Sequence, residues 1–538
     1  MSGKDHGLIR SAGTVSAAVA VSRVTGMARE MVMARLFGAG EVYDAFLLGM
    51  RVPNLARNLF AEGALSAAFI PIFAQYLKTR SKEEAQELSN LTATALIVVV
   101  GAVCAVGMIF APELVQLMAP GFARVPGKLQ LAVLLTRVMF PFLVLIALAA
   151  QAMGLLNASD RYGIPATASI FFNVGSVGVG VALARIWSAN AIVCMAVGVL
   201  AGGALQLAWQ LPTVWREGFS FRPRINVRDP GLRKIAALML PAFLGSAALQ
   251  INTIVSTNFA SRLTDATGHV LNGPVSWLGY AFRFLQLPLG VFGVAIASAT
   301  LPRIARSAAI QEMAQFRATL AHSVGTAMLF TIPSSVGLAI LGESMIALIY
   351  QGGRFQASDT RQTAAALACY SVGLAGYTLV KILAPAFYAL DDARTPMLVS
   401  VASIGLNLGL SFALVDWAGM GHRGLALSIA LVALVSAAAL FELLRRRVGG
   451  LETPRLAWSA ARVAAASGAM AAACLAAQRT AKLGHAANLT LCLPLGVAVF
   501  YAAARLLRVP ELEEVRAACY TALRNAPRPE VGDPPTGN

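Results

Sequence analysis

The chain has 538 residues, of which 57% are hydrophobic and 13% are charged, and its formal net charge is +17. An average soluble domain carries about 25% charged residues, so this chain has too little charge to cover a soluble surface of its size. Its mean hydropathy is +0.68, and long apolar stretches recur from end to end. Lipid offers no hydrogen bonds to an unpaired backbone, so these values exclude a soluble enzyme and predict a polytopic α-helical membrane protein.

In chain order, about fourteen segments are long enough to cross a bilayer, which takes about 20 residues. Residues 14–37 carry Arg23 and Arg29 and no clear small-residue cleavage site, so we interpret them as a first span, not a signal peptide. Residues 42–77 are too long and too polar for one straight span, and Pro53 and Gly63 predict a bend or break there. The remaining spans are predicted near 90–117, 130–156, 163–186, 189–212, 233–260, 274–302, 318–343, 363–390, 396–415, 423–443, 458–478 and 487–507.

Basic residues gather in alternate loops, which predicts the orientation. Loops after even-numbered spans are richer in Lys and Arg than loops after odd-numbered spans, and such loops face the cytoplasm. Both termini are therefore expected in the cytoplasm, and the basic residues are not interpreted as a nucleic-acid site. The tail from residue 510 is expected to form a short surface helix followed by disorder. The largest basic cluster comprises Arg216, Arg222, Arg224, Arg228, Arg233 and Lys234.

Signatures of enzymes and cofactors are missing. There is no Walker A motif, HExxH, GxSxG or dinucleotide fingerprint, and the six cysteines show no metal-binding spacing. We therefore expect no covalent chemistry, no metal and no cofactor. Without an ATP site, transport would be passive or driven by an ion gradient or by the membrane potential, and the sequence leaves these open.

A weak internal repeat indicates two related halves. Residues 63–71 (GALSAAFIP) resemble residues 294–302 (VAIASATLP), about six predicted spans later. Two parallel six-span bundles are a transporter architecture. Chance similarity between Ala-rich helices is the alternative.

Charged residues inside the first two predicted spans are the most informative feature. One Arg at mid-membrane costs about 2.5–3.5 kcal/mol on insertion scales. Several charged residues in these two spans therefore predict a water-filled cavity or pairing with acidic neighbours. An excess of arginines there favours an anionic substrate, because Arg binds phosphate and carboxylate groups in a bidentate manner. Arg283 and Lys381 lie in later predicted spans, and a snorkelling interfacial cation is the alternative for each. The early charges are Arg23, Arg29, Glu30, Arg35, Asp44, Arg51, Arg57 and Glu62.

Four motifs near the N-terminus, together with Asp44-Ala-Phe, resemble the opening of the MurJ (MviN) family of lipid II flippases. They occur in the same order as in that family: SRVTGMARE at 22–30, ARLFGAG at 34–40, VPNLARNLFAEGA at 52–64 and FIP at 69–71. Further matches are Leu155–Asn157 with Ile164–Ala166, Trp277–Pro288, and Lys381 through Phe387-Tyr388 to Thr395-Pro396.

The resemblance implies the fold of the multidrug/oligosaccharidyl-lipid/polysaccharide exporter superfamily. Two six-helix lobes would occupy 1–215 and 216–448, two extra helices 449–508, and a cytoplasmic tail 509–538. The family's cavity cations match Arg23, Arg29, Arg57 and Arg283, with Asp44 and Glu62 as acidic members and Asn54 and Lys381 as further candidate contacts. Phe282 and Gln286 stand where some members carry acidic residues, which puts an ion-pair role at those positions in doubt.

The function expected from this resemblance is that of a flippase in the bacterial inner membrane. It would move lipid II, an undecaprenyl-diphosphate disaccharide-pentapeptide, to the outer leaflet by alternating access. Expected partners are lipid II, membrane lipids and proteins of the cell-wall elongation or division machinery. The alternatives are a flippase for another polyprenyl-linked glycan and a non-transport component of wall synthesis. A cation-coupled drug exporter is disfavoured, because its cavity should carry carboxylates in place of arginines. A membrane glycosyltransferase is disfavoured as well, because it usually needs a long external loop and none of the predicted external loops is long.

Overall fold

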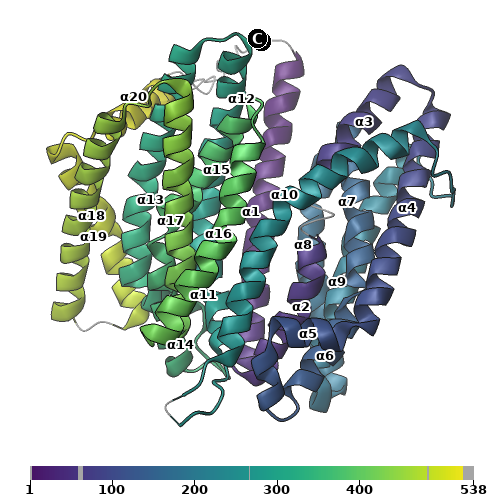
Figure 1. Cartoon of the computed structure of the whole chain (residues 1–538), viewed down its shortest axis with the longest axis horizontal. Helices are drawn as coiled ribbons and strands as arrows, with labels where there is room; N and C mark the ends of the chain where they lie inside the picture. Colours follow the sequence, from purple (N-terminus) through teal and green to yellow (C-terminus); the bar gives the residue numbers. More distant parts are fainter. Residues whose placement is uncertain (1–2, 58–64, 266, 482–483, 525–538) are drawn as a thin grey trace, which may run out of the picture. The chain divides into compact units, whose positions relative to one another are not determined.

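The computed structural model describes residues 3–57, 65–265, 267–481 and 484–524. Within these ranges the secondary structure is helical, with no strand and two isolated β-bridges, Thr264–Val270 and Gly352–Phe355. The helices of the first half, shown in Figure 1, are α1 Gly3–Phe37, α2 Glu41–Arg57, α3 Leu65–Thr79, α4 Lys82–Ile109, α5 Ala111–Met118, α6 Lys128–Met139, α7 Phe142–Ala158, α8 Gly163–Ile186, α9 Ala191–Arg216 and α10 Pro230–Arg262. Short 3-10 turns lie at Pro120–Arg124 and Ser188–Asn190.

The second half continues in the same manner. Its helices are α11 Pro274–Pro288, α12 Ala295–Ala309, α13 Met313–Tyr350, α14 Ala357–Ser371, α15 Leu374–Tyr388, α16 Arg394–Phe412, α17 His422–Val448, α18 Thr453–Ala481, α19 His485–Leu506 and α20 Pro510–Arg524. A π-helical turn at Leu289–Val294 joins α11 to α12 directly after Pro288, and another at Ala413–Trp417 ends α16.

Each predicted span falls on helix. Among the described residues, ten helices are long and apolar enough to cross a membrane, and α14 with α15 forms a further candidate bent by 44°. The segments predicted at 14–37, 42–77 and 233–260 are helical as α1, α2 with α3, and α10, but they do not enter that count. The break predicted in 42–77 corresponds to the separate helices α2 and α3, although Pro53 lies inside α2 and Gly63 falls outside the described residues.

The chain packs as two compact units. Unit 1 comprises Met1–Phe282, Ile346–Ala366 and Ser400–Ser428, and unit 2 comprises Arg283–Met345, Leu367–Val399 and Ile429–Asn538. The lobe boundaries expected from the resemblance stay a prediction.

In unit 1, small residues allow helices to pack at close range. Helix α8 packs along α9 and also contacts α1, while α7 packs on α9 and α4. At Gly202 of α9, a Cβ atom would lie 2.6 Å from the carbonyl oxygen of Phe172 on α8. Glycine is therefore required at this crossing, as is common where membrane helices approach closely.

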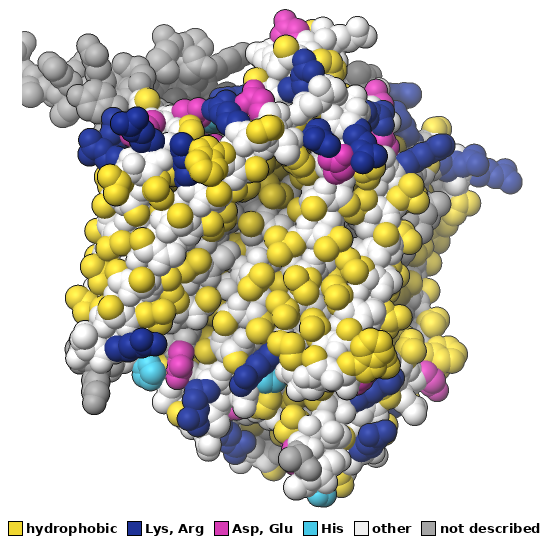
Figure 2. All heavy atoms as spheres, turned by 60° about the vertical axis from the view of Figure 1, so that its left-hand side comes forward, with side chains coloured by type: hydrophobic (Ala, Val, Ile, Leu, Met, Phe, Trp, Pro, Cys, Tyr) yellow, Lys and Arg dark blue, Asp and Glu magenta, His cyan; other side chains and the backbone are white. Residues whose placement is uncertain are grey.

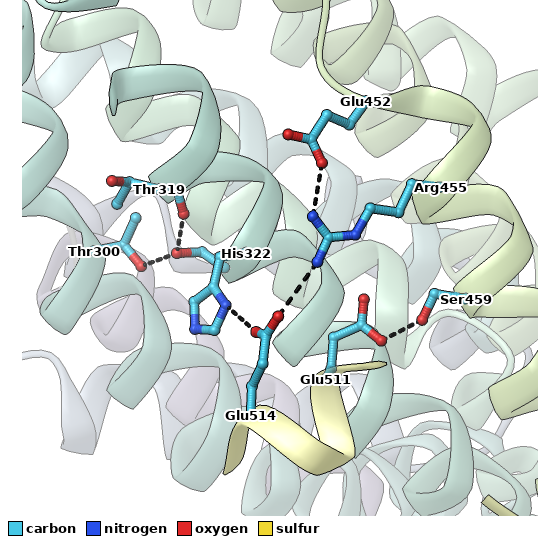
Figure 3. Close-up of polar contacts among 9 residues, drawn as sticks. Thr300, Thr319, His322, Glu452, Arg455, Ser459, Glu511 and Glu514 are labelled. Carbon is cyan, nitrogen blue, oxygen red and sulfur yellow. Dashed lines mark hydrogen bonds and ion pairs between the residues drawn. The ribbon is translucent and has the colours of Figure 1, made fainter. Parts of the chain in front are cut away.

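Unit 2 has a core built from α12, α13, α15 and α17. Phe316, Ile382, Phe387 and Leu440 are buried in it, among other apolar residues. Helices α18 and α19 pack against each other and against α13, and α20 follows α19. The helix predicted at the start of the C-terminal tail is confirmed as α20, and its Glu511 is 3% exposed and hydrogen-bonded to Ser459 of α18 (Figure 3).

The distribution of side chains fits insertion in a bilayer. On the face shown in Figure 2, hydrophobic side chains cover the middle of the helices, while Lys and Arg gather toward their ends. Large apolar side chains such as Val106, Leu493 and Val497 are more than half exposed. Lipid solvates such side chains and water does not.

Candidate functional site

Helix α1 carries the first two cations of the predicted site. The Arg23 side chain is exposed. The Arg29 side chain is 20% exposed, its Nη2 lies 2.8 Å from Oε1 of Glu30, and its guanidinium lies over the Phe172 ring at 5.3 Å from the centroid. The Arg29 cation is thus partly balanced by a neighbouring carboxylate and by an aromatic face.

Hydrogen bonds hold α1 against α2 and α8. The Tyr43 hydroxyl of α2 donates to Oε2 of Glu30 at 3.1 Å. From α8, Nδ2 of Asn173 donates to the Ser22 carbonyl and to Oγ1 of Thr25, both at 3.2 Å. These bonds fix the face of α1 on which Arg29 lies, so that its guanidinium reaches Phe172.

Asp44 lies at the centre of a buried polar network. Its Oδ2 accepts from Nζ of Lys128 at 2.9 Å and from the Gly273 N–H at 2.8 Å. Its Oδ1 accepts from Ser276 twice, from the backbone N–H at 2.9 Å and from the hydroxyl at 2.6 Å. Lys128 also donates to Asn272 at 2.8 Å. Asp44 is completely buried, and its carboxylate caps the N-terminus of α11, where negative charge is favoured.

An aromatic layer surrounds this network within unit 1. Tyr43 stacks on Tyr280 of α11 with 5.0 Å between ring centroids, and Tyr280 contacts the rings of Tyr350 and Phe355. Nearby, Nε1 of Trp277 donates to Oδ1 of Asp359 at 3.0 Å. Together with the Asp44 network, these contacts join α2, α6 and α11 to residues 350–359.

The backbone of residues 351–356 also holds the end of α1. The Arg354 N–H donates to the Arg35 carbonyl at 2.9 Å. Gly353 has a positive φ of 58°, and its position leaves no room for a Cβ beside the Arg35 backbone. The loop therefore closes over the C-terminal end of α1.

The other predicted residues are distributed over both units. Asn54 is partly buried on α2, Arg57 ends α2, and the Arg57 side chain and the whole of Glu62 lie outside the described residues. Arg283 on α11 and Lys381 on α15 belong to unit 2, and both side chains are exposed. The structure thus brings together Arg29 with Glu30, and it encloses Asp44 in protein contacts.

Sequence reasoning missed the partners of Asp44. Lys128 and Ser276, which donate to Asp44, were not singled out, and neither were Tyr43 and Asp359 in the aromatic layer. The available signals were Asn272-Gly273 ahead of a helix start and a lysine at the first residue of α6. Neither signal reveals which carboxylate would receive these donors.

Two solved membrane transporters have an arrangement of helices similar to that of this chain. A solved structure of a multidrug resistance MATE family transporter of the MOP superfamily, in an inward-facing conformation, matches with a TM-score of 0.61 at 17% identity, covering 82% of this chain and 95% of that one. A structure of lipid II flippase MurJ in an inward closed conformation matches with a TM-score of 0.75 at 22% identity. The match covers 91% of this chain and 98% of that one. The fold of this chain is therefore similar to the folds of these two transporters.

Sequence comparison shows the family to which the chain belongs. The family model described as lipid II flippase MurJ matches residues 33–494. The lipid II flippase MurJ of Burkholderia cenocepacia is 34% identical over 455 residues, 84% of this chain and 86% of the relative. A probable lipid II flippase MurJ of Vibrio cholerae is 32% identical over 528 residues, which cover 95% of this chain and 98% of the relative. The chain belongs to the lipid II flippase MurJ family, and it is a multi-pass membrane protein.

Proposed function

We propose that this protein transfers lipid II from the cytoplasmic to the outer leaflet of the bacterial inner membrane by alternating access, without covalent chemistry. The observation that carries the proposal is the family match over residues 33–494. The cations of α1 support it, because a diphosphate needs positive partners inside the membrane.

The proposed headgroup site uses Arg23, Arg29, Arg57 and Arg283. Guanidinium groups bind the diphosphate and peptide carboxylates through paired, charge-assisted hydrogen bonds. The Glu30 carboxylate lies 2.8 Å from Nη2 of Arg29, and in this proposal the anionic headgroup takes its place. Substrate binding therefore means exchange of the Glu30 carboxylate for a phosphate oxygen. Asn54, Glu62 and Lys381 are further proposed contacts.

For Asp44 we propose a role in closing the outer end of the pathway. With the N-terminus in the cytoplasm, α1 leads outward, so the buried network between α2, α6 and α11 lies near the outer surface. All four hydrogen bonds to Asp44 come from protein donors. Alternating access requires closing contacts that break in the other state. Asp44 would meet substrate only after this network opens.

An inside-negative membrane potential favours outward movement of the anionic headgroup in this proposal. Two negative charges that cross fully outward gain about 4–5 kcal/mol per 100 mV of inside-negative potential, unless protein charge or counter-ions move with them. We propose that no cofactor takes part. Among the described residues no group of three His, Cys, Asp or Glu side chains is placed to hold a metal ion.

Binding of purified lipid II to the protein in nanodiscs tests the headgroup site. Arg29→Gln should weaken binding about tenfold, the effect of losing one charge-assisted hydrogen bond. Arg185→Gln removes one exposed positive charge at the end of α8 and serves as the matched control. Equal affinities for wild type and Arg29→Gln would show that Arg29 does not bind the headgroup. Binding of another polyprenyl-linked glycan in place of lipid II would reject the proposed substrate.

A further inference from the structure

The basic segment between α9 and α10 has no part in the proposed headgroup site. Residues 219–228, which we call the strap, follow the end of α9 at Arg216 and precede α10 at Pro230. The strap is not helical. It begins at Phe219, which is 4% exposed and packs against Phe73 of α3 with 5.5 Å between ring centroids. One end of the strap is thus fixed in the core of unit 1.

Side chains of α4 hold the strap backbone at alternate residues. The Ser220 N–H donates to Oε1 of Gln86 at 3.0 Å. The Arg222 N–H donates to Oδ1 of Asn90, and the Arg224 N–H donates to Oγ1 of Thr94, both at 3.1 Å. Four residues of helix advance about 6 Å, and two residues of extended chain advance about 6.6 Å. The two spacings match, so α4 is a template that keeps the strap extended.

The side chains of the extended strap alternate in character. Phe221 and Ile225 lie on one side, and Arg222 and Arg224 lie on the other, because successive side chains of an extended chain point in opposite directions. Phe221 is 51% exposed and Ile225 81%, and Val227 beyond them is 75% exposed. All three arginines of the strap are exposed as well. The strap therefore presents an apolar side and a cationic side away from unit 1.

The charge around the strap favours an anionic surface. The stretch 216–234 holds six basic residues and two acidic ones. Both acidic side chains already have protein partners: Glu217 lies 2.8 Å from Arg161, and Asp229 accepts from the Leu232 N–H to cap α10. The strap follows the end of the candidate span α9 and contacts the first turns of the candidate span α4. The ends of spans are where lipid headgroups are expected.

We propose that the strap is an interfacial anchor for the cytoplasmic leaflet, with Phe221, Ile225 and Val227 inserted among headgroups and Arg222, Arg224 and Arg228 bound to anionic lipid phosphates. Segments that combine exposed apolar side chains with Arg lie in the interface plane and prefer anionic lipids. The anchor fixes the connection between the sixth and seventh spans to α4. It requires that the chain is inserted in a bilayer in the orientation predicted from its basic loops, and it is independent of the substrate.

Depth-dependent quenching of a fluorophore tests this anchor on the full chain. A label on Val227→Cys, in a chain whose six cysteines are replaced by Ala or Ser, is read in nanodiscs that contain lipids with a nitroxide on an upper carbon of the acyl chain, just below the phosphates. We expect strong quenching, which increases when phosphatidylglycerol replaces phosphatidylcholine. A label on Ser220→Cys, on the cationic side of the strap, is the control and should be quenched much less.

Variants of the strap arginines and of Asn90 on α4 give a second test of the anchor. Replacing Arg222 and Arg224 together by Gln should reduce the enrichment of phosphatidylglycerol around the strap about tenfold, while Arg137→Gln with Arg185→Gln should not. Asn90→Leu removes the acceptor for the Arg222 N–H and should lower quenching at 227, whereas Asn90→Asp keeps an acceptor and should preserve it.

Three outcomes would overturn the proposal. The first is a label at 227 that stays unquenched in both lipids and accessible to a water-soluble quencher. The second is equal quenching at 220 and 227. The third is a label protected only in native membranes, which would mean that the strap docks on a protein.

Discussion

At the scale of single residues, the Asp44–Lys128 pair is the most demanding feature of the molecule. The side chains are 1% and 0% exposed, with 2.9 Å between Oδ2 and Nζ. Burying two charges costs several kcal/mol per ion unless each has further partners. Here Asp44 accepts three more hydrogen bonds, from Gly273 and Ser276, and Lys128 also lies over the Phe122 ring.

Removing one partner of this pair should therefore be costly. Asp44→Asn leaves Lys128 buried without its carboxylate, and we expect a loss of about 3–5 kcal/mol in the free energy of unfolding. Thermal unfolding of the purified protein in detergent measures it. The double variant Asp44→Leu with Lys128→Met removes both charges and should recover most of the loss. An unchanged unfolding temperature for Asp44→Asn would contradict the structure.

Glu30 should compete with the lipid II headgroup for Arg29. Glu30→Gln removes the negative charge beside Arg29 while keeping a hydrogen-bond acceptor for Tyr43. We expect lipid II to bind several-fold more tightly to this variant in nanodiscs, the opposite of Arg29→Gln. Weaker binding would mean that Glu30 supports the headgroup site in place of blocking it.

The sequence identified the important charges but not their partners. Arg29, Asp44 and Arg283 can be picked out without a structure, because a charged side chain inside an apolar span costs free energy to insert into the membrane. The partner of Asp44 is 84 residues away and its α11 donors are more than 220 residues away. No local pattern encodes such distances, so the sequence could not show which protein donors surround Asp44, and its role as a substrate contact stays a prediction.

At the scale of elements, α20 is joined to two other helices by acidic side chains. Glu511 is bonded to Ser459 of α18, and Glu514 lies 2.6 Å from His322 of α13 and 3.3 Å from Arg455 of α18 (Figure 3). Gly325 of α13 makes room for Glu511, because a Cβ there would lie 2.6 Å from its Oε1. The first turns of α20 are thus fitted to a specific place in unit 2.

Gly325→Ala should displace α20. The added methyl group collides with Glu511, so the contact with Ser459 is lost, and backbone amides 511–517 should exchange hydrogen markedly faster. Gly337→Ala lies on the same helix with nothing within 4 Å of the new Cβ and is the matched control. Hydrogen exchange with mass spectrometry measures both. Equal protection of α20 in the two variants would contradict this packing.

Asp392 gives the connection before α16 a dependence on pH. Hydrogen bonds from the backbone and side chain of Thr395, then the charge of Arg447, lower the pKa of Asp392 below its ordinary value of 3.8. A lowered pKa stabilises the folded state above the unfolded pKa, and this stability is lost as the pH falls through the folded pKa.

The thermal stability of wild type should therefore fall toward that of Asp392→Asn when the pH drops from neutral to below 3.8. Unfolding temperatures across this range measure the difference, and Asp391→Asn is the control for loss of the neighbouring carboxylate. A difference between wild type and Asp392→Asn that stays constant with pH would contradict a stabilising role for the ionised Asp392 carboxylate.

The helices themselves could be predicted well. Every predicted span contains helix because apolar length alone forces that structure in lipid. The breaks were harder: α6 and α7 divide at Phe140-Pro141, and α11 passes through a π-helical turn after Pro288. Such breaks depend on tertiary packing as much as on the proline.

At the scale of the whole molecule, the sequence was sufficient for class and family, and the comparisons confirmed both. Motifs in the first 71 residues carried the family, and composition carried the membrane assignment. The arrangement of the two units through a transport cycle is not encoded in any local pattern, because it depends on which closing contacts exist in each state.

The most direct test of the central claim is the topology of lipid II in cells depleted of this protein. An externally added enzyme that cleaves only outward-facing lipid II reports transfer across the membrane. We predict that the cleavage product is lost on depletion, restored by the wild-type chain, and not restored by Arg29→Ala expressed at the same level. Undiminished product on depletion, in cells without a second flippase, would contradict the assignment of lipid II as the substrate.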